Sequence, residues 1–197
     1  MSEGYVGVKF ETVFVERRAP KHKCIKELIF WCRKFSEMGI APKHAAGSYG
    51  NMSCRTPKGF IITGASTNHE NMKETDFAEV LSVSGKQVRA IGLCAPSSES
   101  VMHHMIYSTR PDINAIFHSH DDIVLKNAKK LGIPVTEKEE PYGTPELMEQ
   151  AKKLCMHDYF ILKNHGIISL GKTMKEAGKR AVEMHKKAAE LSRTVKQ

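Results

Sequence analysis

The stretch that decides the fold lies at residues 159–170 and reads YFILKNHGIISL. Two apolar runs flank an Asn-His-Gly triplet at residues 164–166, a combination typical of a tight turn between strands. We therefore expect two adjacent strands, with His165 in the turn and the glycine allowing close approach of the backbone. Two further short apolar runs, INAIFHS at residues 113–119 and GFIIT at residues 59–63, predict buried strands of the same kind.

Helical patterns surround these strands, and several carry start signals. Thr144 followed by Pro145 predicts a helix that starts at the proline, and Ser98 is expected to cap another. Helices are expected over residues 21–38, 98–110, 121–131 and 145–155. A last helix is expected to start at a capping box formed by Thr173 and Glu176. Its apolar stripe consists of Ala177, Ala181, Met184, Ala188 and Leu191. Residues 5–15 and the VLSV run before Gly85 favour strands. Strands and helices do not alternate strictly, so we expect one α/β domain whose mostly antiparallel central sheet is flanked by helices.

Composition narrows the class of protein and its partners. The chain has 197 residues, enough for one domain, and 41% hydrophobic and 26% charged residues are ordinary for a globular protein. The formal net charge of +8 suggests an anionic partner. No motif typical of nucleic-acid binding accompanies that charge, so we expect no nucleic-acid partner. Much of the surplus lies in residues 172–196, where it predicts a solvated helix face.

The five cysteines include no CxxC pair, which argues against a zinc ribbon or a thioredoxin-like motif. No signal peptide or membrane-spanning run is recognisable. We therefore expect a reduced, cytoplasmic protein with no membrane partner.

The most informative histidines are His118 and His120, which close the strand at 113–119. Side chains two residues apart on a strand point to the same face, so both imidazoles can bind one metal ion. Such a site needs a third ligand, and the candidates are His103, His104, His157 and His165. His-x-His by itself is also compatible with two hydrogen-bonded or surface histidines.

Glu99 follows Ser97 and Ser98 at the start of a predicted helix, where an acid can act simply as a first-turn residue. The two serines and the nearby helix N-terminus also suit a phosphate group. The GSYGN loop at residues 47–51 is a second candidate phosphate site, although such loops are often ordinary turns. Asn68 and His69 are expected to be exposed loop residues, and Asp121 and Asp122 to cap a helix.

Taken together, six segments resemble the class II aldolase/adducin family, and within it the branch of fuculose-phosphate aldolases. In chain order they are GNMSCR at 50–55, FIITGAS at 60–66, PSSE at 96–99, YSTRPDINAIFHSH at 107–120, PYGTPEL at 141–147 and FILKNHGIISLGKT at 160–173. The resemblance implies the family's α/β/α fold over residues 21–197, with residues 1–20 as an N-terminal extension.

The resemblance also implies a role for individual residues. His118, His120 and His165 match the three ligands of a divalent metal, expected to be Zn²⁺, with Mn²⁺ or Co²⁺ as alternatives. Glu99 matches the catalytic carboxylate. The positions that match substrate phosphate contacts are Gly50, Asn51, Ala65, Ser66, Ser97 and Ser98.

The function implied is a metal-dependent aldolase, an aldehyde-lyase of carbohydrate metabolism. It would cleave a phosphorylated ketose, such as fuculose 1-phosphate, to dihydroxyacetone phosphate and an aldehyde through a metal-stabilised enediolate, with Glu99 as acid and base. The alternatives are a lyase similar to methylthioribulose-1-phosphate dehydratase, a pentulose-phosphate 4-epimerase, or a non-catalytic adducin-like assembly module.

The resemblance further implies a homotetramer with its active site at a subunit boundary. The sequence departs from the family at Glu139, which falls where the family often has a tyrosine, with Tyr142 nearby. A second family tyrosine belongs to a longer tail than the one that ends here at Gln197. The sequence therefore does not identify the residue that gives a proton to the departing aldehyde.

Overall fold

An eight-stranded sheet forms the centre of the computed structural model, which describes residues 9–194. Its strand order is β1-β7-β6-β5-β4-β8-β10-β9. The bounds are β1 (Glu11–Glu16), β4 (Asn51–Thr56), β5 (Gly59–Thr63), β6 (Phe77–Ser84), β7 (Gln87–Gly92), β8 (Ala115–Ser119), β9 (Tyr159–Leu162) and β10 (Gly166–Gly171). Strand β1 runs parallel to β7, whereas the other neighbours in this sheet pair antiparallel. The mainly antiparallel sheet predicted from the sequence is confirmed.

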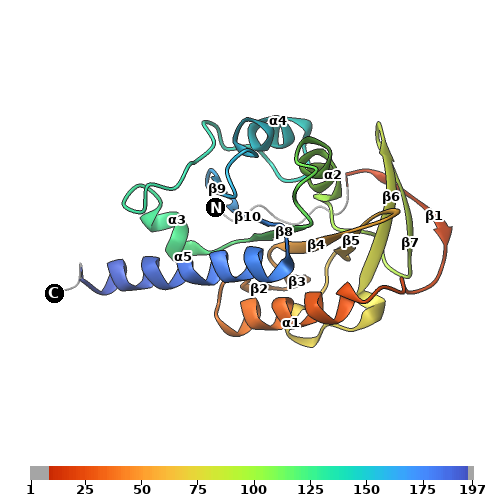
Figure 1. The fold of residues 1–197 in the computed structure, drawn as a ribbon, viewed down its shortest axis with the longest axis horizontal. Helices are drawn as coiled ribbons and strands as arrows, with labels where there is room; N and C mark the ends of the chain where they lie inside the picture. The colour runs from red at the N-terminus through yellow and green to blue at the C-terminus, as the bar shows by residue number, and fades with distance from the viewer. Residues whose placement is uncertain (1–8, 195–197) are drawn as a thin grey trace.

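Helices cover both faces of the sheet, as Figure 1 shows. One face carries α1 (Cys24–Glu37), α3 (Asp122–Asn127) and α5 (Met174–Thr194). The other carries α2 (Ser100–Thr109) and α4 (Pro145–Leu154). Short connections include β2 (Lys43–His44), β3 (Gly47–Ser48) and two 3-10 turns, η1 (His69–Asn71) and η2 (Glu74–Asp76). This arrangement is the expected single α/β domain.

Two apolar cores result from the alternation of side chains along the strands. Phe117 packs into the core beneath α1 and α5, whereas its neighbour Ile116 packs into the core beneath α2 and α4. Ile167 and Ile168 of the next strand divide in the same way. Both faces of the central strands are therefore buried, which explains why these segments read as continuous apolar runs.

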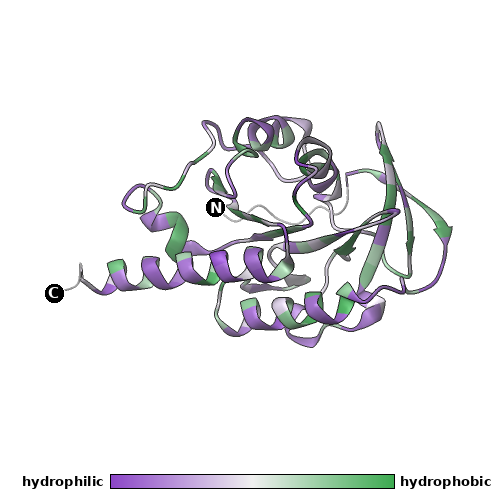
Figure 2. Ribbon diagram, viewed as in Figure 1, coloured by the Kyte–Doolittle hydropathy of each residue, from purple (hydrophilic) through white to green (hydrophobic). Residues whose placement is uncertain are grey.

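The long helix α5 has the predicted apolar stripe. Ala177, Ala181 and Ala188 are buried, and Met184 and Leu191 are half-buried. Figure 2 shows hydrophilic and hydrophobic residues alternating along this helix. Its opening differs from a regular capping box, because Glu176 accepts from the backbone of Lys172 instead of Thr173.

The starts of α4 and α2 show which local sequence signals are enough to predict where a helix begins. The Thr144 hydroxyl accepts from the backbone N–H of Leu147, and Pro145 is the first residue of α4, as predicted. The prediction that Ser98 caps α2 is wrong, because Glu99 occupies the N-cap position. A turn closed by the Ser100 N–H and hydroxyl on the Ser97 carbonyl delays the helix.

Helix α3 is shorter than the expected 121–131, and Asp121 caps it by accepting from the Val124 N–H. The edge strand β1 covers part of the strand predicted over residues 5–15, and residues 5–8 lie outside the described part of the chain. The division into residues 1–20 and 21–197 stays a prediction, and its ends at 1–8 and 195–197 also lie outside that part.

The cysteines differ from the expectation of a fully reduced chain, since Cys24 and Cys54 form a disulfide. They are 30 residues apart, and only the packing of the start of α1 against β4 brings them together. Cys32, Cys94 and Cys155 are free thiols. Among the described helices, none has the length and apolar character needed to cross a membrane.

Candidate active site

Three imidazoles meet where β8 and β10 lie side by side. His118 belongs to β8, His120 follows that strand directly, and His165 lies in the turn before β10. Strand β10 pairs antiparallel with β8, so this turn reaches the end of β8. One ring nitrogen from each of the three side chains lies within 4.8 Å of the others, close enough to share one metal ion. The structure therefore brings together the three predicted ligands.

Gly166 makes room for this cluster. A Cβ atom at this position would lie 2.6 Å from Cε1 of His118 and 3.2 Å from Cδ2 of His120. Gly50, directly before β4, permits a different close approach, because its φ is +99° and a side chain there would collide with the His118 carbonyl oxygen. Gly166 therefore lets the backbone approach the imidazoles, and Gly50 lets the chain before β4 approach the backbone of β8.

Glu99 reaches the same point from the N-terminus of α2. Its Oε1 lies 3.0 Å from Nε2 of His165, and its Oε2 lies 3.1 Å from Nε2 of His118. The side-chain amide of Asn51 donates to Oε2 at 2.6 Å. The Glu99 side chain makes no capping bond to its helix, so its contacts are with the imidazoles and Asn51 and not with the backbone of the first turn.

The hydrogen bond on the far side of His118 sets its tautomer. Nδ1 lies 2.9 Å from the Ile167 carbonyl oxygen, which can only accept, so Nδ1 carries the proton. In the neutral ring, Nε2 then presents a lone pair to Nε2 of His120, 3.2 Å away, and to the Glu99 carboxylate. These atoms converge on one point, where a cation can accept lone pairs from them. The donor set therefore fits a divalent metal, for which neutral imidazole is a common ligand.

Burial and charge shift the pKa values in the cluster. Burial lowers the pKa of His118, and burial together with the charges of His118 and His165 holds the pKa of His120 well below its usual range. Burial alone would raise the pKa of Glu99. Interactions with His118 and His165 and the bond from Asn51 outweigh it and hold that pKa well below the ordinary value. The site thus combines an ionised carboxylate with two imidazoles, His118 and His120, whose charged forms are disfavoured.

The other histidines that were candidates for the third ligand are not members of this group among residues 9–194. His103 is buried behind Glu99, where its Nδ1 lies 2.7 Å from the Ser53 hydroxyl, which in turn contacts the Tyr107 hydroxyl at 2.8 Å. Burial lowers the pKa of His103 to about 3, so its ring is neutral.

A cavity of about 450 Å³ opens over the cluster. Its wall contains Glu99, His120, His165 and the six residues predicted to contact phosphate, which are Gly50, Asn51, Ala65, Ser66, Ser97 and Ser98. Two backbone donors there are already engaged, because the Ala65 N–H donates to Ala95 and the Ser97 N–H to Thr63. The hydroxyls of Ser66, Ser97 and Ser98 are therefore the more suitable donors for an anion.

The cavity also contains Tyr49, which sequence reasoning did not single out, and Glu139 and Tyr142, which mark the departure from the family. Tyr49 stacks on His120 with ring centroids 4.8 Å apart. Asn164 donates to Glu139 at 2.6 Å, and both line the opposite part of the wall with Glu140 and Tyr142. Tyr49 is part of the GSYGN loop, which was a predicted phosphate site. Its place in that loop was the sequence feature that could have indicated a position in the cavity wall. His69 was expected to be exposed, but it is buried beneath this region.

Comparison with known proteins places the chain in a family. It belongs to the class II aldolase and adducin family, because the model described as "Class II Aldolase and Adducin N-terminal domain" matches residues 26–191. It is 32% identical to an L-fuculose phosphate aldolase of Methanococcus vannielii over 78% of this chain and 87% of that protein. It is 29% identical to a 5-methylthioribulose-1-phosphate/5-deoxyribulose-1-phosphate aldolase of Rhodospirillum rubrum, over 75% of this chain and 72% of that protein.

A solved L-fuculose 1-phosphate aldolase has the same fold, with a TM-score of 0.72. It is 26% identical, and the match covers 90% of this chain and 88% of the other. The expected fold and the resemblance to this family are thereby confirmed.

Proposed function

We propose that the protein is a metal-dependent aldolase that cleaves a phosphorylated ketose to dihydroxyacetone phosphate and an aldehyde. The observation that carries the proposal is the convergence of three imidazoles and one carboxylate at the base of a cavity with hydroxyl groups in its wall. The aldolases named above support it. Fuculose 1-phosphate represents the substrate class.

His118, His120 and His165 would hold the metal, with Zn²⁺ as the expected ion. A divalent ion bound there supplies Lewis-acid stabilisation of negative charge on the substrate's ketone oxygen. The protein's part is to orient these rings, and the bond from Nδ1 of His118 to the Ile167 carbonyl fixes the orientation and the tautomer of one of them. In the same proposal the protein is a cytoplasmic homotetramer.

Glu99 would move the proton at the carbon next to the ketone. In the direction of synthesis the ionised carboxylate takes a proton from the hydroxymethyl carbon of dihydroxyacetone phosphate. In the direction of cleavage it returns that proton to the same carbon. Asn51 holds one carboxylate oxygen, which leaves the other oriented by His165. The hydroxyls of Ser66, Ser97 and Ser98 would bind the phosphate and position the substrate.

The test combines a panel of ketose 1-phosphates with metal analysis of the same sample. We expect one metal ion per chain at the histidine cluster and release of dihydroxyacetone phosphate from at least one substrate. His118→Ala should lose the metal and the activity. Glu99→Gln should keep the metal and lose at least about 100-fold in turnover. His157→Ala is the matched control, because His157 is exposed and lies outside the cluster.

Three results would contradict this function. Metal-loaded protein that cleaves nothing in the panel would exclude the aldolase. NMR detection of a product with an intact carbon chain would assign the dehydratase or epimerase alternative. Full activity in Glu99→Gln would remove the acid–base role of Glu99.

A further inference from the structure

A second group of metal-ligand side chains lies outside the active-site cavity. Cys24 is the first residue of α1, Cys54 lies in β4, and His22 precedes α1. One ligand atom from each of the three lies within 4.8 Å of the other two. None of the three is among the residues that line the cavity over the histidine cluster within the described chain. The aldolase chemistry proposed above makes no use of them.

We propose that His22, Cys24 and Cys54 form a Zn²⁺ site when the Cys24–Cys54 disulfide is reduced. Reduction by a dithiol transfers two electrons and two protons to the disulfide, and the dithiol itself becomes a disulfide. Zn²⁺ then displaces one proton from each thiol and binds two thiolates and one imidazole. This donor set is one that zinc prefers in proteins.

The hydrogen bonding of His22 supports this assignment. The backbone N–H of Cys24 donates to Nδ1 of His22 at 3.3 Å. Because the N–H is the donor, Nδ1 is unprotonated and directs its lone pair toward the cysteine backbone. This long bond holds the ring beside the two sulfur atoms, and Zn²⁺ would replace the N–H as the partner of the Nδ1 lone pair.

The burial of the two sulfur atoms is a second argument for a zinc ion at this site. Cys24 and Cys54 are 7% and 3% exposed, so two thiolates at this depth are costly without a positive charge beside them. Zn²⁺ supplies that charge within direct bonding distance. His22 is only half-buried, which gives the ion a path from solvent.

The surroundings of His22 leave room for a fourth ligand of the zinc ion. A cavity of about 410 Å³ adjoins it, lined also by Arg18, Lys21, Pro57, Lys58 and Glu79. Zinc usually takes four ligands, and water that enters this cavity can be the fourth.

The proposed site would preserve one structural link in both redox states. The disulfide joins the start of α1 to β4, three residues after Asn51. A zinc ion held by the same cysteines would join the same two elements under reducing conditions. The inference does not depend on the proposed aldolase activity.

Cobalt titration of the full-length protein tests the site, because only thiolate ligands give a sulfur-to-cobalt charge-transfer band. We expect reduced wild-type protein to bind one more Co²⁺ per chain than oxidised protein and to show this band. Oxidised wild-type protein should lack the band. This comparison needs no variant, and the all-histidine cluster cannot produce the band.

Variants then identify the ligands. Cys24→Ser and Cys54→Ser should abolish the band, and His22→Ala, which keeps both thiols, should weaken Co²⁺ binding at this site by at least about tenfold. Cys94→Ser is the matched control and should keep the band, because Cys94 is a free thiol outside the group. Absence of the band in reduced wild-type protein would overturn the proposal, as would a band that survives Cys24→Ser and Cys54→Ser.

Discussion

Among single residues, His69 shows how burial alone changes the chemistry of a side chain. It is 1% exposed, and neither ring nitrogen has a hydrogen-bond partner within residues 9–194. Only its backbone N–H is bound, to the Ser48 hydroxyl at 3.1 Å. Burial lowers the pKa of His69 to about 4, so the ring stays neutral in the folded protein.

This pKa shift predicts a pH dependence of stability. Below about pH 6.5 the unfolded chain binds a proton at this position and the folded chain does not, so the free energy of unfolding falls until about pH 4. Above about pH 6.5 the contribution of His69 to the free energy of unfolding is constant. Replacing His69 with Leu removes this pH-dependent contribution. Between pH 7.5 and pH 5 the free energy of unfolding should therefore fall by about 2 kcal/mol more in wild-type protein than in His69→Leu.

Urea unfolding at the two pH values measures this difference. His157→Leu is the control, because it removes an exposed histidine, and it should keep the wild-type dependence. An equal loss of stability in wild-type protein and His69→Leu would show that His69 titrates normally in the fold.

At the scale of elements, the contact between α5 and α1 depends on one small residue. Gly178 of α5 is buried against the Trp31 ring of α1, and a Cβ atom at this position would overlap ring carbons of Trp31. Trp31 also packs against Phe35 and Phe117 and has little room to move. The sequence stripe of α5 marks the buried face, but it does not reveal how near the tryptophan lies.

Gly178→Ala should therefore destabilise the protein even though alanine favours helix by about 1 kcal/mol over glycine. Overpacking of a core contact costs about 1–3 kcal/mol, and we expect the balance to be a net loss of stability of about 1 kcal/mol. Thermal or urea unfolding measures it. Lys179→Ala, on the exposed neighbour, should change stability by less than about 0.5 kcal/mol. A stabilised Gly178→Ala variant would refute close packing here.

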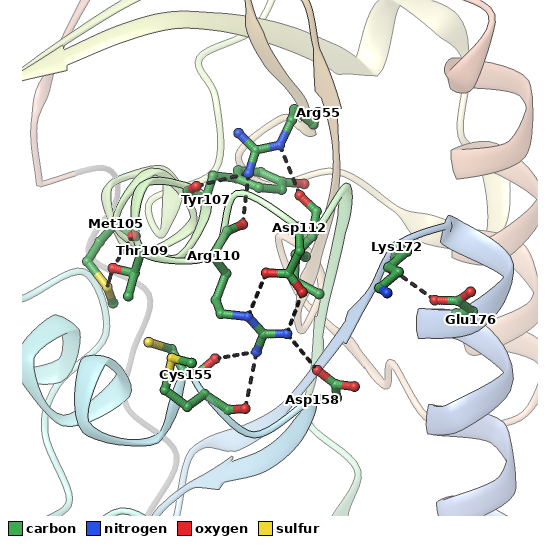
Figure 3. A network of polar contacts seen from close by, with 12 residues as sticks. Arg55, Met105, Tyr107, Thr109, Arg110, Asp112, Cys155, Asp158, Lys172 and Glu176 are labelled. Carbon is green, nitrogen blue, oxygen red and sulfur yellow. Dashed lines mark hydrogen bonds and ion pairs between the residues drawn. The ribbon is translucent and has the colours of Figure 1, made fainter.

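For the whole molecule, Arg110 joins segments that are distant in sequence, as Figure 3 shows. Its guanidinium donates to both carboxylate oxygens of Asp112 at 2.9 Å and to Asp158 at 3.0 Å. It also donates to the carbonyl oxygens of Cys155 and Met156 at 2.9 and 3.2 Å. The Arg110 side chain thus holds three segments together, which are the end of α2, the start of the segment leading to β8, and the connection from α4 to β9.

Arg110→Ala should lower the free energy of unfolding by about 3 kcal/mol, because two backbone carbonyls lose a charged donor in a largely buried place. Equilibrium urea unfolding is the measurement. Lys153→Ala breaks an ion pair with Glu137 whose partners are both exposed, so it should cost less than about 1 kcal/mol. Similar losses in the two variants would mean that Arg110 is no more than a surface charge.

Local patterns in the sequence determined much of this protein. Side-chain alternation put His118 and His120 on one face of a strand, and the Thr144–Pro145 pair defined the start of α4. The turn at residues 164–166 was evident from apolar runs on either side of a glycine. These features could be predicted because their causes act within one turn or one strand.

Tertiary structure decided the contacts between distant segments. The pairing of β8 with β4 and β10 sets His118 between Asn51 and the turn that holds His165, and the close turn at Ser97 directs Glu99 toward them. The Cys24–Cys54 bond and the burial of His69 arise in the same way. Residue spacing along a chain reports on neighbours within a few residues, whereas these contacts depend on strand order and helix packing across the whole sheet.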